Sequence, residues 1–219
     1  RNEAHNLISQ ALDLGINLFD TAPLYGNKNE DGVAEVVLGE GLGIRKDQAI
    51  ISTKFGRTAR KVMPPRFNAV EAKRSCDESL KRLGRDWIDL LFFHSPFEAG
   101  EIEDDVWQAL AELKEAGKIR FIGHSVSMYD DTKALSEQWM SERKIDAIQV
   151  VLSPFNRETR PLVETAAKLG RAVVARECMA NGFLSGQIRK DTVFPEGSLN
   201  ARYSREEIAE RVEYASALS

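Results

Sequence analysis

Short apolar runs alternate with amphipathic segments along the whole chain. The apolar runs are rich in Ile, Val, Leu and Phe, whereas the segments between them repeat apolar positions every three to four residues. The first pattern is typical of strands buried on both faces, and the second predicts helices that cover them. Because the two alternate regularly, the chain is predicted to be an α/β protein with a parallel sheet.

Six strands and the helices between them can be placed on this pattern. The predicted strands are 16–20, 49–54, 87–94, 119–123, 145–151 and 172–175. The predicted helices are 3–14, 68–83, 104–116, 130–143 and 161–169. Asn68 with Glu71 three residues later is a capping-box signal, and Gly84 is a stop signal, so the second helix is bounded at both ends.

A polar residue stands at or near the C-terminal end of every predicted strand. These residues are Asp20, Lys54, His94, Ser125, Gln149 and Arg176. The carboxyl ends of parallel strands lie at the same edge of a sheet, where the functional residues of α/β barrels are found. We therefore expect these six side chains to gather on one face of the molecule.

Two architectures surround a parallel sheet with helices, the open doubly wound sheet and the closed (β/α)8 TIM-type barrel. An open sheet that binds a nucleotide usually has a glycine-rich turn after its first strand, but Gly39, Gly41 and Gly43 are expected to follow a helix. The barrel is therefore favoured, as a single domain over residues 1–219. Only six of its eight strands are visible, so we expect the first and last strand–helix units to be absent from this chain, which would leave it inactive if it occurs alone.

Composition narrows the functional classes. The chain has 219 residues, 42% of them hydrophobic, and a formal net charge of -4. No apolar run approaches a membrane span, and basic residues mix with acidic ones, so a cytoplasmic protein without a membrane or nucleic-acid partner is expected. Two cysteines and three histidines show no metal-ligand spacing, so no metal is expected. Cys76 lies on an apolar helix face and is predicted to be a packed thiol.

Four residues near the ends of the first three strands suggest proton transfer to a carbonyl group. A tyrosine has a pKa near 10, and an ammonium group ~4 Å from the phenol oxygen would favour the phenolate. Lys54 could therefore lower the pKa of Tyr25, while Asp20 holds the charge on Lys54 and His94 orients the substrate oxygen. None of these residues supplies a hydride, so a cofactor is required.

Five segments carry a resemblance to the aldo-keto reductase family. They are GINLFDTAPLYG, IISTKFG, IDLLFFHSP, GKIRFIGHS and NGFLSG, in the family's order and spacing over nearly the whole chain. The resemblance implies a (β/α)8 barrel that binds NADPH, less often NADH. It also implies a catalytic tetrad of Asp20, Tyr25, Lys54 and His94, in which Tyr25 is the acid in reduction and the base in oxidation.

The resemblance also implies where the cofactor binds. Ser125 and Gln149 would hold the nicotinamide carboxamide, with Arg176 beside the ring. The segment along the pyrophosphate would contribute Gly182, Leu184, Ser185 and Gly186. Three positions depart from the family pattern: Val126 replaces a usual Asn, Arg176 a common aromatic residue and Cys178 a common Pro.

The expected function is NAD(P)H-dependent reduction of aldehydes or ketones to alcohols, with Tyr25 as general acid. Two alternatives stay open: a sugar or alcohol dehydrogenase that runs in the oxidative direction, and a non-catalytic subunit that binds the dinucleotide as a redox sensor. Pocket walls are expected from the loops 55–67, 97–101 and 128–131, whose basic residues favour an acidic or sugar-like substrate. These basic residues are Arg57, Arg60, Lys61 and Arg66.

Two other histidines are given structural interpretations. His124 stands next to Ser125 at the end of a strand, where contact with substrate is conceivable, but a buried histidine held by a hydrogen bond is the more common arrangement. His5 is expected to be a surface residue of the first helix.

Overall fold

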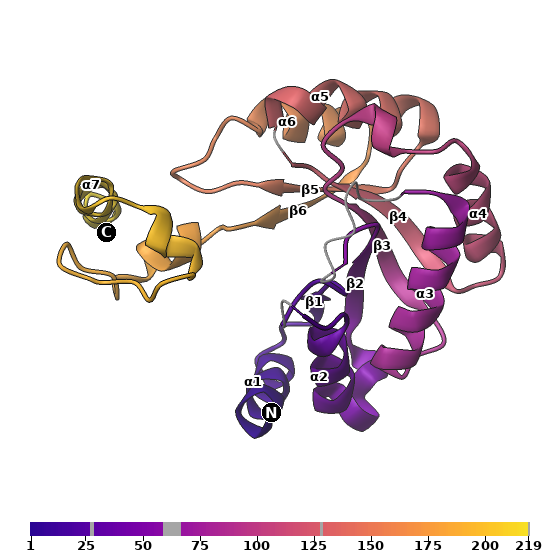
Figure 1. Cartoon of the computed structure of the whole chain (residues 1–219), viewed down its shortest axis with the longest axis horizontal. Coiled ribbons are helices and arrows are strands. Elements are labelled where there is room, and N and C mark those ends of the chain that lie inside the picture. The colour runs from indigo at the N-terminus through magenta and orange to yellow at the C-terminus, as the bar shows by residue number, and fades with distance from the viewer. Residues whose placement is uncertain (27–28, 59–66, 128, 219) are drawn as a thin grey trace.

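Six parallel strands form one curled sheet with helices on its convex side (Figure 1). The computed structural model describes residues 1–26, 29–58, 67–127 and 129–218. The strands are β1 (Leu18–Asp20), β2 (Ile50–Phe55), β3 (Ile88–His94), β4 (Ile119–Ser125), β5 (Ala147–Val151) and β6 (Ala172–Arg176). They pair in chain order, β1 to β6. Helices on one side only and strands in sequential order confirm the predicted barrel class over the doubly wound sheet.

The connections between the strands are mostly helical. The α-helices are α1 (Asn2–Asp13), α2 (Val33–Leu42), α3 (Ala69–Leu83), α4 (Asp105–Glu115), α5 (Tyr129–Gln138), α6 (Arg160–Lys168) and α7 (Arg205–Ser216). Short 3-10 segments are η1 (Gly43–Gln48), η2 (Ala99–Glu101), η4 (Ala180–Ser185) and η5 (Leu199–Arg202), and the π-helical turn η3 spans Trp139–Arg143. As predicted, the Asn68 side chain caps α3 by accepting from the N–H of Glu71, and Gly84 ends that helix with φ 64°.

Side chains alternate between the two faces of the sheet, and each face has its own apolar cluster. On the convex face, Ile51, Leu91 and Phe93 are fully buried in the main core with the helices. On the concave face, Leu90 and Phe92 pack with Ala147 in a smaller cluster. This division follows from the period of two along a strand, so every second residue of a strand points into the curl.

Strand register places the predicted polar residues on the concave face. Asp20 pairs with Ser52, Lys54 pairs with Phe92, and His94 pairs with Ser125 across neighbouring strands. Ser125 in turn pairs with Gln149. On the opposite face of β2, Thr53 Oγ1 donates to the buried Glu35 Oε1 of α2 at 2.6 Å. The carboxyl ends of the strands therefore present polar side chains to one region, as the sequence predicts.

Several predicted boundaries need correction. Strand β1 begins at Leu18 rather than at residue 16, and both Ile16 and Leu18 are exposed because β1 pairs only with β2 among the described residues. Gly39 and Gly41 lie within α2 instead of following a helix. A Cβ at Gly39 would lie 2.8 Å from the carbonyl oxygen of Leu83, so glycine permits close packing of α2 against the end of α3.

The segment after β6 forms a separate small cluster. Its buried members are Ala180 and Phe183 of η4 and Ile208 of α7, and Phe155 of the loop after β5 packs against them. The Tyr214 hydroxyl of α7 donates to the carbonyl of Pro154 at 3.3 Å, which ties α7 to that loop. Figure 1 shows α7 standing away from the helices that cover the sheet.

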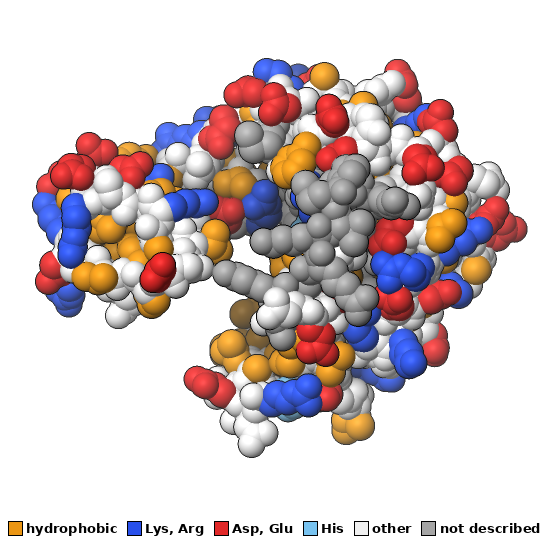
Figure 2. Space-filling model, viewed as in Figure 1, with side chains coloured by type: hydrophobic (Ala, Val, Ile, Leu, Met, Phe, Trp, Pro, Cys, Tyr) orange, Lys and Arg blue, Asp and Glu red, His pale blue; other side chains and the backbone are white. Residues whose placement is uncertain are grey.

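Acidic and basic side chains lie close together on the face of the molecule that Figure 2 shows. Within the described ranges, no helix has both the length and the apolar character needed to cross a bilayer. The expected cytoplasmic location stays a prediction.

Gly56 provides a test of backbone constraint directly after β2. Its φ is +96°, and a Cβ there would lie 2.1 Å from the Phe67 ring. We expect Gly56→Ala to lower the free energy of unfolding by about 2–4 kcal/mol, from backbone strain and overpacking together. Gly117 is a matched control because its φ is +72° with nothing within 4 Å of the added Cβ. Equal losses for both variants, measured by urea unfolding, would contradict the packing argument.

Candidate active site

Lys54 and Asp20 form an ion pair at the ends of β2 and β1. The Lys54 side chain is fully buried, and its Nζ donates to Asp20 Oδ2 at 2.6 Å and to the Thr21 carbonyl at 2.8 Å. The other Asp20 oxygen accepts from the Ser52 hydroxyl at 2.6 Å. Burial lowers the pKa of Lys54, and the charge of Asp20 opposes that shift. The carboxylate therefore stabilises the ammonium form, as the sequence predicts.

Tyr25 and His94 complete a group of four side chains. The Tyr25 ring meets the His94 ring edge to face, with 5.7 Å between ring centroids. Lys54 Nζ lies 4.8 Å from the centroid of the Tyr25 ring. The structure thus brings together Asp20, Tyr25, Lys54 and His94 from three strand ends and one following loop. Their assignment as a catalytic tetrad stays a prediction.

The expected lowering of the Tyr25 pKa is wrong for this structure. Burial, followed by the negative charge of Asp20, raises the pKa of Tyr25 to about 12, and Arg176 opposes the shift. The Lys54 ammonium faces the ring and is neutralised by Asp20, and no hydrogen bond joins the Tyr25 hydroxyl to another described residue. The phenol is therefore protonated near neutral pH, which is the form that a general acid requires.

His94 is a neutral imidazole in this environment. It is 6% exposed, and burial together with the charges of Lys54, Arg57 and Arg176 lowers its pKa to about 3. Its Nδ1 atom is buried and has no hydrogen-bond partner among the described residues. A neutral imidazole carries one N–H, so His94 can donate a hydrogen bond to a substrate oxygen without carrying charge.

The other histidines and Cys76 have structural surroundings. His124 is fully buried, its Nδ1 lies 3.0 Å from the Ser136 hydroxyl, and its ring packs on Trp139, which confirms the structural interpretation. His5 is half-buried with its Nε2 3.4 Å from Glu40, so the expectation of a plain surface residue is wrong. Cys76 is a buried free thiol, as predicted.

Ser125 and Gln149 lie side by side next to His94. The Ser125 hydroxyl donates to Gln149 Oε1 at 3.1 Å and lies 3.3 Å from the Ser95 hydroxyl. Gln149 is 1% exposed, and its Nε2 has no hydrogen-bond partner among the described residues. A buried amide N–H₂ without an acceptor is costly, so this pair fits a ligand that brings a carbonyl oxygen.

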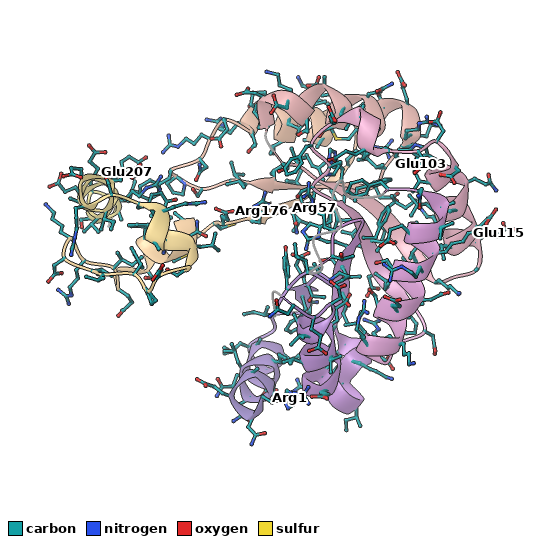
Figure 3. The ribbon with its side chains drawn as sticks, viewed as in Figure 1. Arg1, Arg57, Glu103, Glu115, Arg176 and Glu207 are labelled. Carbon is teal, nitrogen blue, oxygen red and sulfur yellow. The ribbon has the colours of Figure 1, made fainter. Side chains whose placement is uncertain are left out.

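Arg176 is held at the end of β6 by a residue that the sequence reasoning missed. Its Nη1 lies 2.8 Å from Glu177 Oε1, and its Nη2 donates to the Val126 carbonyl at 3.3 Å. Glu177 has a φ of 57°, which is unusual for a residue other than glycine. In Figure 3, Arg176 lies near the centre of the view with Arg57 beyond it, toward the sheet. Adjacent opposite charges directly after a strand were the available signal for Glu177.

The predicted pyrophosphate segment lies at a separate place from the tetrad. Gly182 and Gly186 have φ values of 94° and 73°, and the Ser185 hydroxyl donates to the Gly182 carbonyl at 2.6 Å. Leu184, Ser185 and Gly186 line a cavity of about 280 Å³ against α7. The segment is connected to the strand ends through Asn181, which donates to Glu177 Oε2 at 3.1 Å. Binding of a pyrophosphate there stays a prediction.

Removing the carboxylate of Asp20 tests how the buried Lys54 is stabilised. In Asp20→Asn the ammonium keeps its burial and loses its counter-charge, so we expect the free energy of unfolding to fall by about 3 kcal/mol. Ser52→Ala is the control, since it removes only one hydrogen bond to Asp20 and should cost about 1 kcal/mol. Urea unfolding of both variants provides the comparison, and equal losses would contradict the counter-charge role.

Comparisons with known proteins point to one family. The model of the Aldo/keto reductase family matches residues 1–218. The chain is 38% identical over 128 residues to L-galactose dehydrogenase of Arabidopsis thaliana, covering 56% of this chain and 38% of that protein. It is 29% identical to aldo-keto reductase yakc [NADP(+)] of Schizosaccharomyces pombe, covering 94% of this chain and 62% of the relative.

A solved structure shares the same fold. Glycerol dehydrogenase AKR11B4 of Gluconobacter oxydans has a TM-score of 0.77 with 26% identity, over 96% of this chain and 65% of that chain. The chain therefore spans less than two thirds of the length of each of these three proteins. The family model covers residues 1–218, and the strands of the parallel sheet pair in chain order. The chain therefore belongs to the aldo/keto reductase family of oxidoreductases.

Proposed function

We propose that the chain carries the proton-transfer site of an NAD(P)H-dependent reductase of aldehydes or ketones, with Tyr25 as general acid. The observation that carries this proposal is the buried Lys54–Asp20 pair, whose ammonium lies 4.8 Å from the centroid of the Tyr25 ring. A neutral His94 contacts the same phenol ring edge to face. A protonated phenol and a neutral imidazole together suit a carbonyl oxygen that gains negative charge.

The role of each side chain follows from its charge. His94 donates a hydrogen bond that orients the carbonyl oxygen, and the Tyr25 hydroxyl delivers a proton to that oxygen. Asp20 keeps Lys54 protonated beside the phenol ring, and Arg176 is the cation whose charge favours the phenolate that forms. Ser125 and Gln149 would hold the nicotinamide cofactor, which would supply hydride chemistry at the carbonyl carbon.

We infer the cofactor site from the same strand ends. The unpaired Gln149 amide and the Ser125 hydroxyl suit a carboxamide, with Arg176 next to them at the end of β6. The segment with Gly182, Leu184, Ser185 and Gly186 is proposed to follow the pyrophosphate. NADPH is proposed as the cofactor, with NADH as the alternative, and the NADP(+) in the name of the yeast relative supports this choice.

A second candidate is oxidation of a sugar or alcohol by the same residues. It is favoured by the names of two similar proteins, L-galactose dehydrogenase and glycerol dehydrogenase. In that direction Tyr25 must accept a proton. A phenol pKa of about 12 leaves little phenolate near neutral pH, so oxidation would require a higher pH than reduction.

Assays in both directions test these proposals. The protein is mixed with NADPH or NADH and a panel of aldehydes and ketones, and the absorbance of the reduced ring is followed. The reverse assay uses the oxidised cofactors with sugars and alcohols. Turnover of a carbonyl substrate supports the reductase, whereas faster turnover of alcohols near neutral pH favours the dehydrogenase. Tight cofactor binding without turnover of any substrate would favour the redox-sensor alternative.

A further inference from the structure

Arg57 is fixed against the backbone that carries His94. Its Nε donates to the carbonyl of His94 at 2.8 Å and to that of Ser95 at 3.1 Å, and its Nη2 donates to Ser95 at 2.5 Å. Its guanidinium also lies 4.0 Å from the centroid of the Phe97 ring. These contacts hold the side chain in one orientation and leave its Nη1 with no acceptor among the described residues. A positive charge is therefore pre-positioned beside the proposed carbonyl site.

Arg57 differs from the two neighbouring cations in having no carboxylate in direct contact. Among the residues that the structure describes, the cations whose charges lower the His94 pKa are Lys54, Arg57 and Arg176. Lys54 is paired with Asp20, and Arg176 with Glu177. Among the described residues, no carboxylate forms an ion pair with Arg57. The negative charge of the nearby Glu101 acts on Arg57 without forming an ion pair, and its carboxylate accepts from the Phe97 N–H at 2.7 Å.

A half-buried guanidinium without a paired carboxylate, next to a binding site, favours an anion. Its desolvation is unfavourable unless a negative group approaches, and a guanidinium binds carboxylate or phosphate through charge-assisted hydrogen bonds. Nε and Nη2 already donate to backbone carbonyls, so Nη1 is the nitrogen left to donate to a ligand. The other predicted basic residues of this loop, Arg60, Lys61 and Arg66, lie outside the described residues.

We propose that Arg57 binds an anionic group, a carboxylate or a phosphate, on the carbonyl substrate, and so makes the enzyme selective for acidic aldehydes or ketones. This inference rests on the proposed reductase function, because it places the bound anion next to the carbonyl oxygen that His94 orients. Arg57 is a specificity-determining residue in this proposal and takes no part in the proton transfer itself.

Kinetics with matched substrates test the proposal. One pair is succinic semialdehyde with butanal, and the other is a phosphorylated glyceraldehyde with glyceraldehyde, which separates carboxylate from phosphate recognition. The readout is the ratio of kcat/KM between the acidic and the neutral member. We expect Arg57→Gln to lower this ratio about 10- to 100-fold for one pair, the effect of losing a charge-assisted hydrogen bond. Arg57→Lys keeps the charge and should lower the ratio less.

The control variant is Arg45→Gln. It removes an arginine of η1 that pairs with Asp13 of α1, and it should leave the ratio unchanged.

A ratio that is the same in wild type and Arg57→Gln for both pairs overturns the proposal while leaving the reductase function intact. If no aldehyde is turned over, the reductase function fails. Binding of succinate, compared with succinamide by titration calorimetry of wild type and Arg57→Gln, then decides the anion site separately, and equal heats overturn it.

Discussion

Replacing Tyr25 with phenylalanine is expected to lower kcat for carbonyl reduction by about 10²–10⁴-fold, the usual contribution of a positioned general acid. The ring keeps its contact with His94, and Lys54 keeps its pairing with Asp20. Only the hydroxyl is lost, so cofactor affinity and the free energy of unfolding should change little. Single-turnover measurement of NADPH oxidation, together with cofactor titration by fluorescence, provides the two values.

The matched control is Tyr203→Phe, which removes a phenol hydroxyl from the C-terminal cluster and should leave kcat unchanged. If Tyr25→Phe retained full turnover, another residue would have to supply the proton. A large loss of cofactor affinity with unchanged kcat would instead place Tyr25 in binding and contradict its role as the acid.

Acidification is expected to destabilise the protein through two buried histidines. His94 and His124 have pKa values lowered from 6.5 to about 3, mainly by burial. Between these values the unfolded chain binds protons that the folded chain does not, so folding stability is present above pH 6.5 and is lost as the pH falls toward 3. From about pH 6 to about pH 4 each histidine should remove roughly 2.5 kcal/mol, and both together roughly 5 kcal/mol.

Urea unfolding over this pH range provides the measurement. His124→Gln should remove about half of the pH-dependent loss, because one of the two titrating groups is gone. Ser136→Ala is the control: it deletes the hydroxyl 3.0 Å from His124 Nδ1 but no titrating group, so the slope with pH should persist. A pH dependence that is unaltered in His124→Gln would show that this ring does not resist protonation.

The sequence predicts the fold well because apolar runs and helix signals are local properties. The six strands and the cap of α3 are examples, since each depends on neighbouring residues. The glycines of α2 were misplaced because what requires a glycine there is a contact distant in sequence. Gly39 packs against the end of α3, far along the chain. The short length of β1 also depends on residues distant in sequence. Among the described residues this strand pairs only with β2, and its apolar sequence does not reveal that the other side is unpaired.

The sequence predicts which residues come together at the site better than it predicts their pKa values. Strand ends and period-two alternation suffice to bring Asp20, Lys54 and His94 together. The phenol pKa was predicted in the wrong direction, because the sequence does not show that Lys54 faces the ring, that Asp20 neutralises it, or that burial is the largest cause of the shift. Glu177 was missed because its pairing with Arg176 is a side-chain contact that the two adjacent charges suggest but do not fix.

The register of β2 has a consequence for how this chemistry withstands disturbance. If β2 slipped by one position, the Lys54 ammonium would point into the apolar core on the convex face of the sheet. Thr53 or Phe55 would then take its place on the concave face. Two hydrogen bonds on the convex side oppose such a slip. The Thr53 hydroxyl donates to Glu35, and the Ile51 N–H donates to Asp89 Oδ2 at 2.9 Å. Lys54 on the concave face is thus kept in register by hydrogen bonds that lie on the opposite face of the sheet.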